Sequence, residues 1–229
     1  MDVGSCLGEM HDAYRTDPVA AVRGQRFIKV LHRHLSADFE ARLTPQARRR
    51  GIHVVLEAKI FGSHKPKDVD VSVVDPTNGP LMMVGIRSQM SSVGKNALSY
   101  YEGIIGECIS LQERFPLSTI GYVYLMPLRP IKEGSELEVV PHGRYAQMYR
   151  AITGRSGQDY SARRGVYDQF AYMVVDFASD PPELKDDLLH VAVPDTDLSI
   201  GTFVERMVAT FKERHVFLDD ANLGIQVFN

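Results

Sequence analysis

The chain has 229 residues, of which 44% are hydrophobic and 24% are charged, and its net charge at pH 7 is −3. This composition excludes a disordered or fibrous protein, and the length allows one sizeable globular core. Because Cys6 and Cys108 are the only cysteines, the N-terminal segment is polar and no apolar run could cross a bilayer, we expect a soluble, cytoplasmic protein without disulfides, a secretory signal or a membrane partner.

The first elements in chain order are a helix and three strands. An Asp-Pro pair with the sequence of an N-cap, followed by apolar residues at helical spacing, predicts a helix from about Asp17 to Ala41. Alternating and β-branched residues predict strands over 52–61 and 69–74. A turn signal then leads into a continuously apolar strand over 81–86. We expect the three strands to form an antiparallel meander.

A crossover unit follows the meander. The sequence predicts a helix over 96–115 and a fourth buried strand over 119–126. A strand, a helix and a strand in this order favour parallel pairing of the two strands through a right-handed connection. The remaining predictions are a helix over 142–152, a helix or a strand over 167–177, a short extended segment over 189–193, and a helix over 199–215 capped by Ser199. Together these elements predict an α/β fold.

Three segments between about residues 60 and 177 are similar to those of a known family. They are FGSHKPKDVDVSVV; IRSQMSSVGKN followed by a helix with Glu102 and Gly106; and GRYAQMYRAITGR followed by GVYDQFAYMVVDF. With them the chain resembles the XhoI-type type II restriction endonucleases, which have the PD-(D/E)xK nuclease fold. The resemblance implies a restriction-endonuclease-like mixed central sheet flanked by helices.

The resemblance also implies a domain organisation, an activity and partners. It predicts a single nuclease-like domain over 1–229, with a core at about 17–130 and a family-specific C-terminal part at about 131–229. The implied activity is Mg²⁺-dependent hydrolysis of double-stranded DNA by a homodimer, beside a partner methyltransferase or another subunit of a defence system. Two other functions stay open: a catalytically degenerate relative that binds DNA or a partner subunit, and a protein-binding domain with no role in nucleic-acid chemistry.

The catalytic residues that the resemblance implies are only partly present. The family's catalytic aspartate corresponds to Asp70, whereas its Glu-x-Lys corresponds to Gly85-Ile86-Arg87. Gly85 has no ligand atom, and Arg87 keeps a positive charge but stays protonated and cannot transfer a proton. Mg²⁺ accepts one or two carboxylates together with waters and a substrate phosphate. A second carboxylate must therefore come from another position.

Two segments offer replacements for the missing residues. Glu102 lies on the predicted helix, where some nucleases of this fold place the second carboxylate, so Asp70 and Glu102 are the predicted metal ligands. Glu57-Ala58-Lys59 is an E-x-K triplet on the neighbouring strand, where alternation puts Glu57 and Lys59 on one face, and Lys59 would supply the missing ammonium. The alternatives are that Glu102 is a solvated helix residue, and that Glu57 and Lys59 are an exposed pair on an edge strand.

Two polar segments are candidates for DNA contacts. The first, directly after the third strand, contains Ser88, Gln89, Ser91, Ser92, Lys95 and Asn96. The second has five arginines against Asp159 alone between residues 144 and 164, with Arg144 and Arg150 on a predicted helix. Such groups suit phosphate and base contacts, so we predict that both segments flank Asp70 on one concave side. An ordinary helix start and a solvated helix face are the alternatives.

Overall fold

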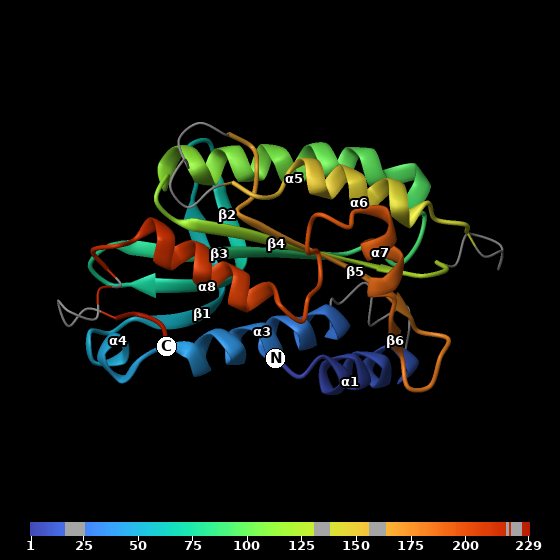
Figure 1. Cartoon of the computed structure of the whole chain (residues 1–229), viewed down its shortest axis with the longest axis horizontal. Coiled ribbons are helices and arrows are strands. Elements are labelled where there is room, and N and C mark those ends of the chain that lie inside the picture. Colours follow the sequence, from blue (N-terminus) through green and yellow to red (C-terminus); the bar gives the residue numbers. More distant parts are fainter. Residues whose placement is uncertain (17–25, 131–137, 156–163, 219, 221–225) are drawn as a thin grey trace.

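The computed structural model describes residues 1–16, 26–130, 138–155, 164–218, 220 and 226–229. A mixed sheet of six strands, in the order of the sequence, runs through the molecule (Figure 1). The strands are β1 (His53–Phe61), β2 (Pro66–Asp75), β3 (Gly79–Ser88), β4 (Thr119–Pro127), β5 (Gln169–Asp176) and β6 (Glu183–Leu184). β1, β2 and β3 pair antiparallel, β3, β4 and β5 pair parallel, and β6 is antiparallel to β5. The predicted mixed α/β fold is therefore confirmed.

Helices cover both faces of the sheet. The helices are α1 (Val3–Thr16), α3 (Arg26–Arg42), α4 (Pro45–Arg49), α5 (Val93–Arg114), α6 (His142–Ala151), α7 (Asp186–Ala192) and α8 (Phe203–Arg214). α1, α3 and α8 enclose one hydrophobic cluster against the sheet, and α5, α6 and α7 enclose the other (Figure 1). In the described part of the chain, none of these helices has the length and hydropathy that a membrane span requires.

The parallel pairing predicted for β3 and β4 is confirmed. β3 pairs in parallel with β4 through the intervening α5, and every residue of β4 is buried. The apolar stripe of α5, which includes Ile104, Cys108 and Leu111, packs in the second cluster. Burial on both faces explains why β3 and β4 are continuous apolar runs rather than alternating ones.

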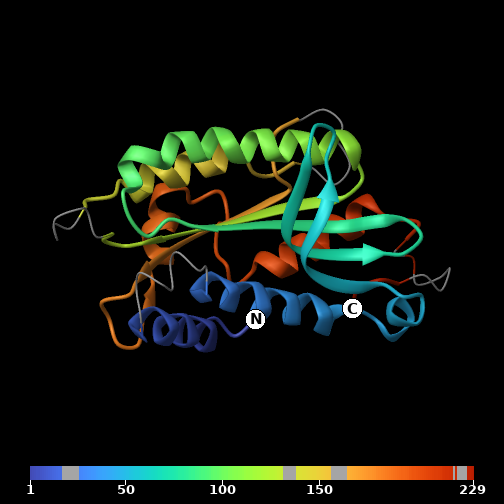
Figure 2. The same ribbon diagram turned by 180° about the vertical axis from the view of Figure 1, so that it is seen from behind.

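Strand β2 changes from one face of the sheet to the other at Asp70. Val71 and Val73 belong to the cluster beneath α3, whereas Val69 belongs to the cluster beneath α5. Residues two apart on a regular strand share a face, so β2 is distorted between Val69 and Val71. The β1–β2 hairpin therefore bends away from the sheet, and Figure 2 shows it reaching towards α5. Asp70 lies at the bend.

Strand β1 is interrupted at the same level as β2. Leu56 pairs with Val71 and Ala58 pairs with Val69, but Glu57 between them has no ladder partner and adopts a left-handed backbone with φ of 53°. Beyond the bend, the hairpin tip docks on α5 through the amide of Ser63, which donates to the Ser110 carbonyl at 2.9 Å. The hairpin is thus held at both ends, with its corner at Glu57 and Asp70.

The structure differs from the sequence predictions in the C-terminal third. The segment predicted to be extended over 189–193 lies mostly in α7, so that prediction is wrong. Asp186 and Asp187 in the first turn of α7 favour a helix N-terminus, and a short apolar run alone does not distinguish a helix from a strand. The 167–177 segment, predicted as a helix or a strand, is the strand β5.

Helix boundaries also differ from those predicted. α8 begins at Phe203, and the Ser199 hydroxyl donates to Asp186 instead of capping that helix. The predicted start of the first helix at Asp17 lies outside the described residues, and α3 accounts for its later part. α1 was not predicted, because the polar N-terminal segment has only a short buried stripe.

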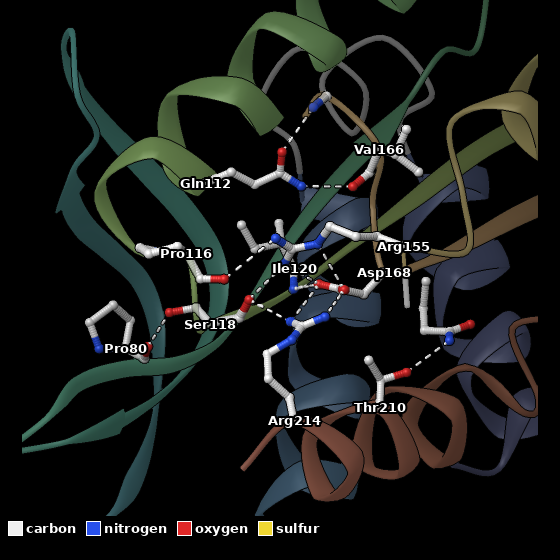
Figure 3. A network of polar contacts seen from close by, with 12 residues as sticks. Pro80, Gln112, Pro116, Ser118, Ile120, Arg155, Val166, Asp168, Thr210 and Arg214 are labelled. Atoms are coloured by element: carbon white, nitrogen blue, oxygen red, sulfur yellow. Dashed lines mark hydrogen bonds and ion pairs between the residues drawn. The ribbon is translucent and has the colours of Figure 1, made fainter. Parts of the chain in front are cut away.

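A buried ionic network joins the starts of β4 and β5 to the end of α8 (Figure 3). The Asp168 carboxylate accepts hydrogen bonds from Arg155 at 2.8 and 3.0 Å, from Arg214, and from the amide of Ile120 at 2.6 Å. All three charged side chains are almost completely buried. Arg155 belongs to the basic segment 144–164 that is predicted to flank Asp70, but it lies in the interior and is not a surface group for DNA.

Candidate functional site

A polar cleft of about 910 Å³ lies where the bent hairpin leaves the sheet, between α3 and α5. It contains Asp70 and combines charges of both signs. Its cationic side chains are Lys29, Lys59, Lys65, Lys67 and Arg87, and its carboxylates are Glu57, Asp68, Asp70 and Glu107. The cleft therefore brings together residues from six elements: α3, β1, β2, β3, α5 and β4, which contributes Tyr122.

Asp70 is held in place by the neighbouring strand. Its Oδ2 accepts a hydrogen bond of 2.6 Å from the amide of Ile86, and its side chain is 26% exposed. Burial raises the pKa of the Asp70 carboxyl to about 6, although the Ile86 amide lowers this pKa; Glu107 and Glu57 raise it further. The carboxylate is therefore a destabilised anion at neutral pH, and an added cation would relieve that cost.

Gly85 lies beside Asp70 on the adjacent strand. Val71 pairs with Val84, so Asp70 and Gly85 are the next residues along the two strands. A Cβ atom at Gly85 would lie 2.6 Å from the Tyr122 ring and 3.5 Å from Oε1 of Glu107. The buried Tyr122 ring thus occupies the place of a side chain on β3, and a carboxylate from α5 reaches the same place.

Glu107, rather than Glu102, is the carboxylate that α5 brings to Asp70. Glu102 is exposed and does not line the cleft, whereas Glu107 is half-buried, lines it, and accepts a 2.5 Å hydrogen bond from Lys67. At about 100° per residue, two helical positions five apart lie on different sides of the helix. The apolar stripe of α5 could have indicated Glu107 from the sequence, because Glu107 lies three residues after the buried Ile104 and therefore on the side of α5 that faces the sheet.

The other predicted catalytic side chains reach the cleft. The guanidinium of Arg87 lies 4.7 Å from the centre of the Tyr100 ring and faces the cleft, where it keeps its positive charge. Glu57 and Lys59 also line the cleft, and Glu57 pairs with Lys29 of α3 at 2.8 Å. The structure thus brings the E-x-K triplet to Asp70, although the left-handed Glu57 breaks the regular alternation on which its prediction rested.

The polar segment after β3 is used mainly inside the protein. Ser88 lines the cleft, but Gln89 is buried: its Oε1 accepts from the Tyr124 hydroxyl at 2.8 Å, and its Nε2 donates to the carbonyl of Ser92. Asn96 also donates to the Ser92 carbonyl. Gln89 therefore orders this turn and is not available to read a base, which corrects its predicted role.

The remaining donors at this turn lie outside the cleft. Ser91 and Lys95 are exposed, and Ser92 precedes α5 with a left-handed backbone. The first amides of α5 are already satisfied, because Glu138 accepts hydrogen bonds from the amides of Val93 and Gly94. The Glu138 carboxylate thus occupies the N-terminus of α5, so a DNA phosphate cannot bind to these amides.

The structure does not bring the basic segment of α6 to Asp70. Arg144 and Arg150 are exposed, and neither lines the cleft. Arg150 pairs with Asp195 at a separate hollow. Asp159 and Arg163 lie outside the described residues. The predicted arrangement, with this segment flanking Asp70, is therefore not supported.

His32 of α3 is a cleft residue that the sequence analysis missed. It is 4% exposed, its Nε2 lies 3.8 Å from Oδ1 of Asp70, and neither ring nitrogen has a hydrogen-bond partner among the described residues. Burial lowers the pKa of His32 to about 4, so the ring is neutral at pH 7 and does not form an ion pair with Asp70. One histidine among eight, at a distant position in the sequence, gave no signal.

The residues of the cleft fit a cation that needs few protein ligands. Within the described ranges, no three His, Cys, Asp or Glu side chains are arranged to hold a metal. Asp70 and Glu107 nevertheless face one cleft, and Mg²⁺ keeps several waters beside one or two carboxylates.

Comparison of the chain with protein-family models, curated proteins and solved structures found no match. The class of protein must therefore be inferred from this site.

Proposed function

We propose that this protein is a divalent-metal-dependent endonuclease that hydrolyses phosphodiester bonds of duplex DNA in the Asp70 cleft. One observation carries the proposal: the Glu107 carboxylate reaches the place beside Asp70 where Gly85 provides no side chain. The cleft is also rich in lysine and arginine, as a phosphate-binding site requires. The sequence resemblance to type II restriction endonucleases supports the same assignment.

Each side chain has a role that its position suggests. Asp70 and Glu107 would hold the metal ion, which when bound polarises the phosphoryl oxygen and lowers the pKa of a water. Lys67 and Arg87 carry the positive charge that stabilises the phosphate as negative charge develops on it. Lys59 and Lys65 are exposed at the cleft and would contact the DNA backbone.

The biological setting is proposed on the resemblance alone. A type II restriction enzyme acts as a homodimer, with one active site for each DNA strand, and accompanies a methyltransferase or another defence subunit. A cytoplasmic location would suit that role. These partners are proposals in the same sense as the activity.

The experiment is a digest of methylated and unmethylated plasmid DNA with Mg²⁺ or Mn²⁺. We expect cleavage by the wild-type protein, and its loss in Asp70→Asn and in Glu107→Gln. Glu102→Gln is the matched control on the same helix, and it should cleave like the wild type because Glu102 lies outside the cleft. Full cleavage by Glu107→Gln, with loss in Glu102→Gln, would restore the metal pair predicted from the sequence.

A second candidate function is DNA binding without catalysis. It is favoured by the contact between Lys67 and Glu107, which neutralises the second carboxylate, and by the lack of a carboxylate at Gly85. This candidate predicts salt-dependent binding to duplex DNA with no cleavage in either metal. A protein that neither binds nor cleaves DNA would instead fit a protein-binding domain.

A further inference from the structure

We propose that His32 is a nitrogen ligand for a cation bound at Asp70, and that the site consequently prefers first-row transition-metal ions to Mg²⁺. The inference rests on the proposed function in assigning a cation to this cleft. It adds a ligand from α3, across the cleft from α5, and names the class of metal that the site would take.

The first argument is the position of the imidazole. Nε2 of His32 and Oδ1 of Asp70 are 3.8 Å apart, too far for a hydrogen bond. Two atoms that each bind one ion at about 2.1 Å can lie at most about 4.2 Å apart, so the observed separation is short enough for both atoms to share an ion. The other carboxylate oxygen of Asp70 is taken by the Ile86 amide, which leaves Oδ1 as the oxygen that faces His32.

The second argument is the lack of a partner for a buried polar ring. Both nitrogens of His32 are buried without a hydrogen bond among the described residues. Burying a polar group without a partner costs about 1–3 kcal/mol, so such groups are uncommon and often functional. An imidazole nitrogen that makes no hydrogen bond has a lone pair available for a metal ion. Packing alone gives no reason for a histidine at this position of α3.

The third argument is the chemistry of the ligand set. Mg²⁺ strongly prefers oxygen ligands, whereas imidazole suits first-row transition metals, whose affinities rise from Mn²⁺ to Cu²⁺. The His32 nitrogen, together with the proposed carboxylate ligands Asp70 and Glu107 and with water at the other positions, would give a site of this second kind.

The test measures metal binding by the full chain without DNA. Calorimetric titrations with Co²⁺ and with Mg²⁺ would compare the wild type with His32→Ala and with the similarly sized His32→Gln. His34→Gln is the matched control on the same helix, since His34 pairs with Glu9 outside the cleft. We expect the affinity for Co²⁺ to fall by about tenfold or more in both His32 variants, with a change below about threefold for Mg²⁺.

A spectroscopic measurement identifies the ligand directly. Electron spin-echo modulation of bound Mn²⁺ should show a coupled nitrogen in the wild type and in His34→Gln, and none in His32→Gln. A wild-type spectrum without nitrogen, or undiminished Co²⁺ affinity in His32→Gln, would overturn the inference. Near-ultraviolet circular dichroism of each variant separates loss of the ligand from loss of the fold.

The outcomes distinguish this inference from the proposed function. Cleavage of DNA, together with Co²⁺ binding that does not depend on His32, would leave the nuclease assignment intact and remove the nitrogen ligand. Co²⁺ binding through His32 in a protein that cleaves no DNA would support the nitrogen ligand and remove the nuclease assignment. A wild-type protein that binds no divalent cation would overturn both.

Discussion

At the scale of single residues, burial of the Asp70 carboxylate lowers the stability of the folded protein at neutral pH. The pKa of its carboxyl is about 6 in the folded protein and 3.8 in a model compound, so the folded state binds the proton more tightly. Stability therefore falls as pH rises from about 4 to about 6, and the loss persists above that range. A carboxylate kept at such a position is more readily explained by a ligand than by packing.

The first prediction follows from this pKa. Without metal, Asp70→Asn should raise the free energy of unfolding by about 1–3 kcal/mol at pH 8 and change it little at pH 4, because the amide removes the buried charge and still accepts from Ile86. Urea unfolding in a chelating buffer at the two pH values measures the difference. A variant less stable than the wild type at pH 8 would contradict it.

The second prediction concerns the buried network of Figure 3, in which Asp168 faces Arg155 and Arg214. Asp168→Ala should lower the free energy of unfolding by about 3–5 kcal/mol, because two buried guanidinium groups lose this carboxylate. Asp195→Ala is the control: it removes the exposed partner of Arg150 and should cost at most about 1 kcal/mol. Equal losses in denaturant unfolding would show that the network adds nothing beyond a surface pair.

At the scale of elements, the bend in the β1–β2 hairpin is what creates the cleft. The third prediction compares Glu57→Gly with Glu57→Ala: both lose the pair with Lys29, but only glycine suits a φ of 53°. The glycine variant should be more stable by about 1 kcal/mol. The same comparison at Lys59, on a regular part of β1, should favour alanine. If alanine is also better at Glu57, the bend is not strained.

At the scale of the whole molecule, the charges of the cleft should decide DNA binding. The fourth prediction is that Lys59→Glu and Lys65→Glu each weaken binding to duplex DNA and reduce the salt slope by about one unit. Fluorescence anisotropy over a range of salt concentrations, in a buffer without divalent metal, measures both. Arg144→Glu, an exposed charge outside the cleft, is the control and should have little effect. An equal loss in Arg144→Glu would extend the DNA surface over α6.

The sequence by itself determined the order and type of most elements around the site. β1 to β4 and α5 are where the apolar periodicity predicts them, and the antiparallel meander and the parallel crossover follow from their order. These features are local, or depend on short connections, so the pattern of apolar residues is enough to predict them. Asp70 was identified differently, through the resemblance to the type II restriction endonucleases, whose catalytic aspartate corresponds to it.

Only the tertiary structure decided which side chains meet Asp70. The apolar stripe of α5 indicates that Glu107 lies nearer the sheet than Glu102, but only the packing of α5 shows that its carboxylate reaches the cleft. His32 arrives from a helix far away in the sequence, and the burial of Gln89 and Arg155 depends on partners in other segments. Packing brings distant segments together and decides which polar groups lose water, so the position and the protonation of the site residues depend on contacts that sequence spacing does not specify.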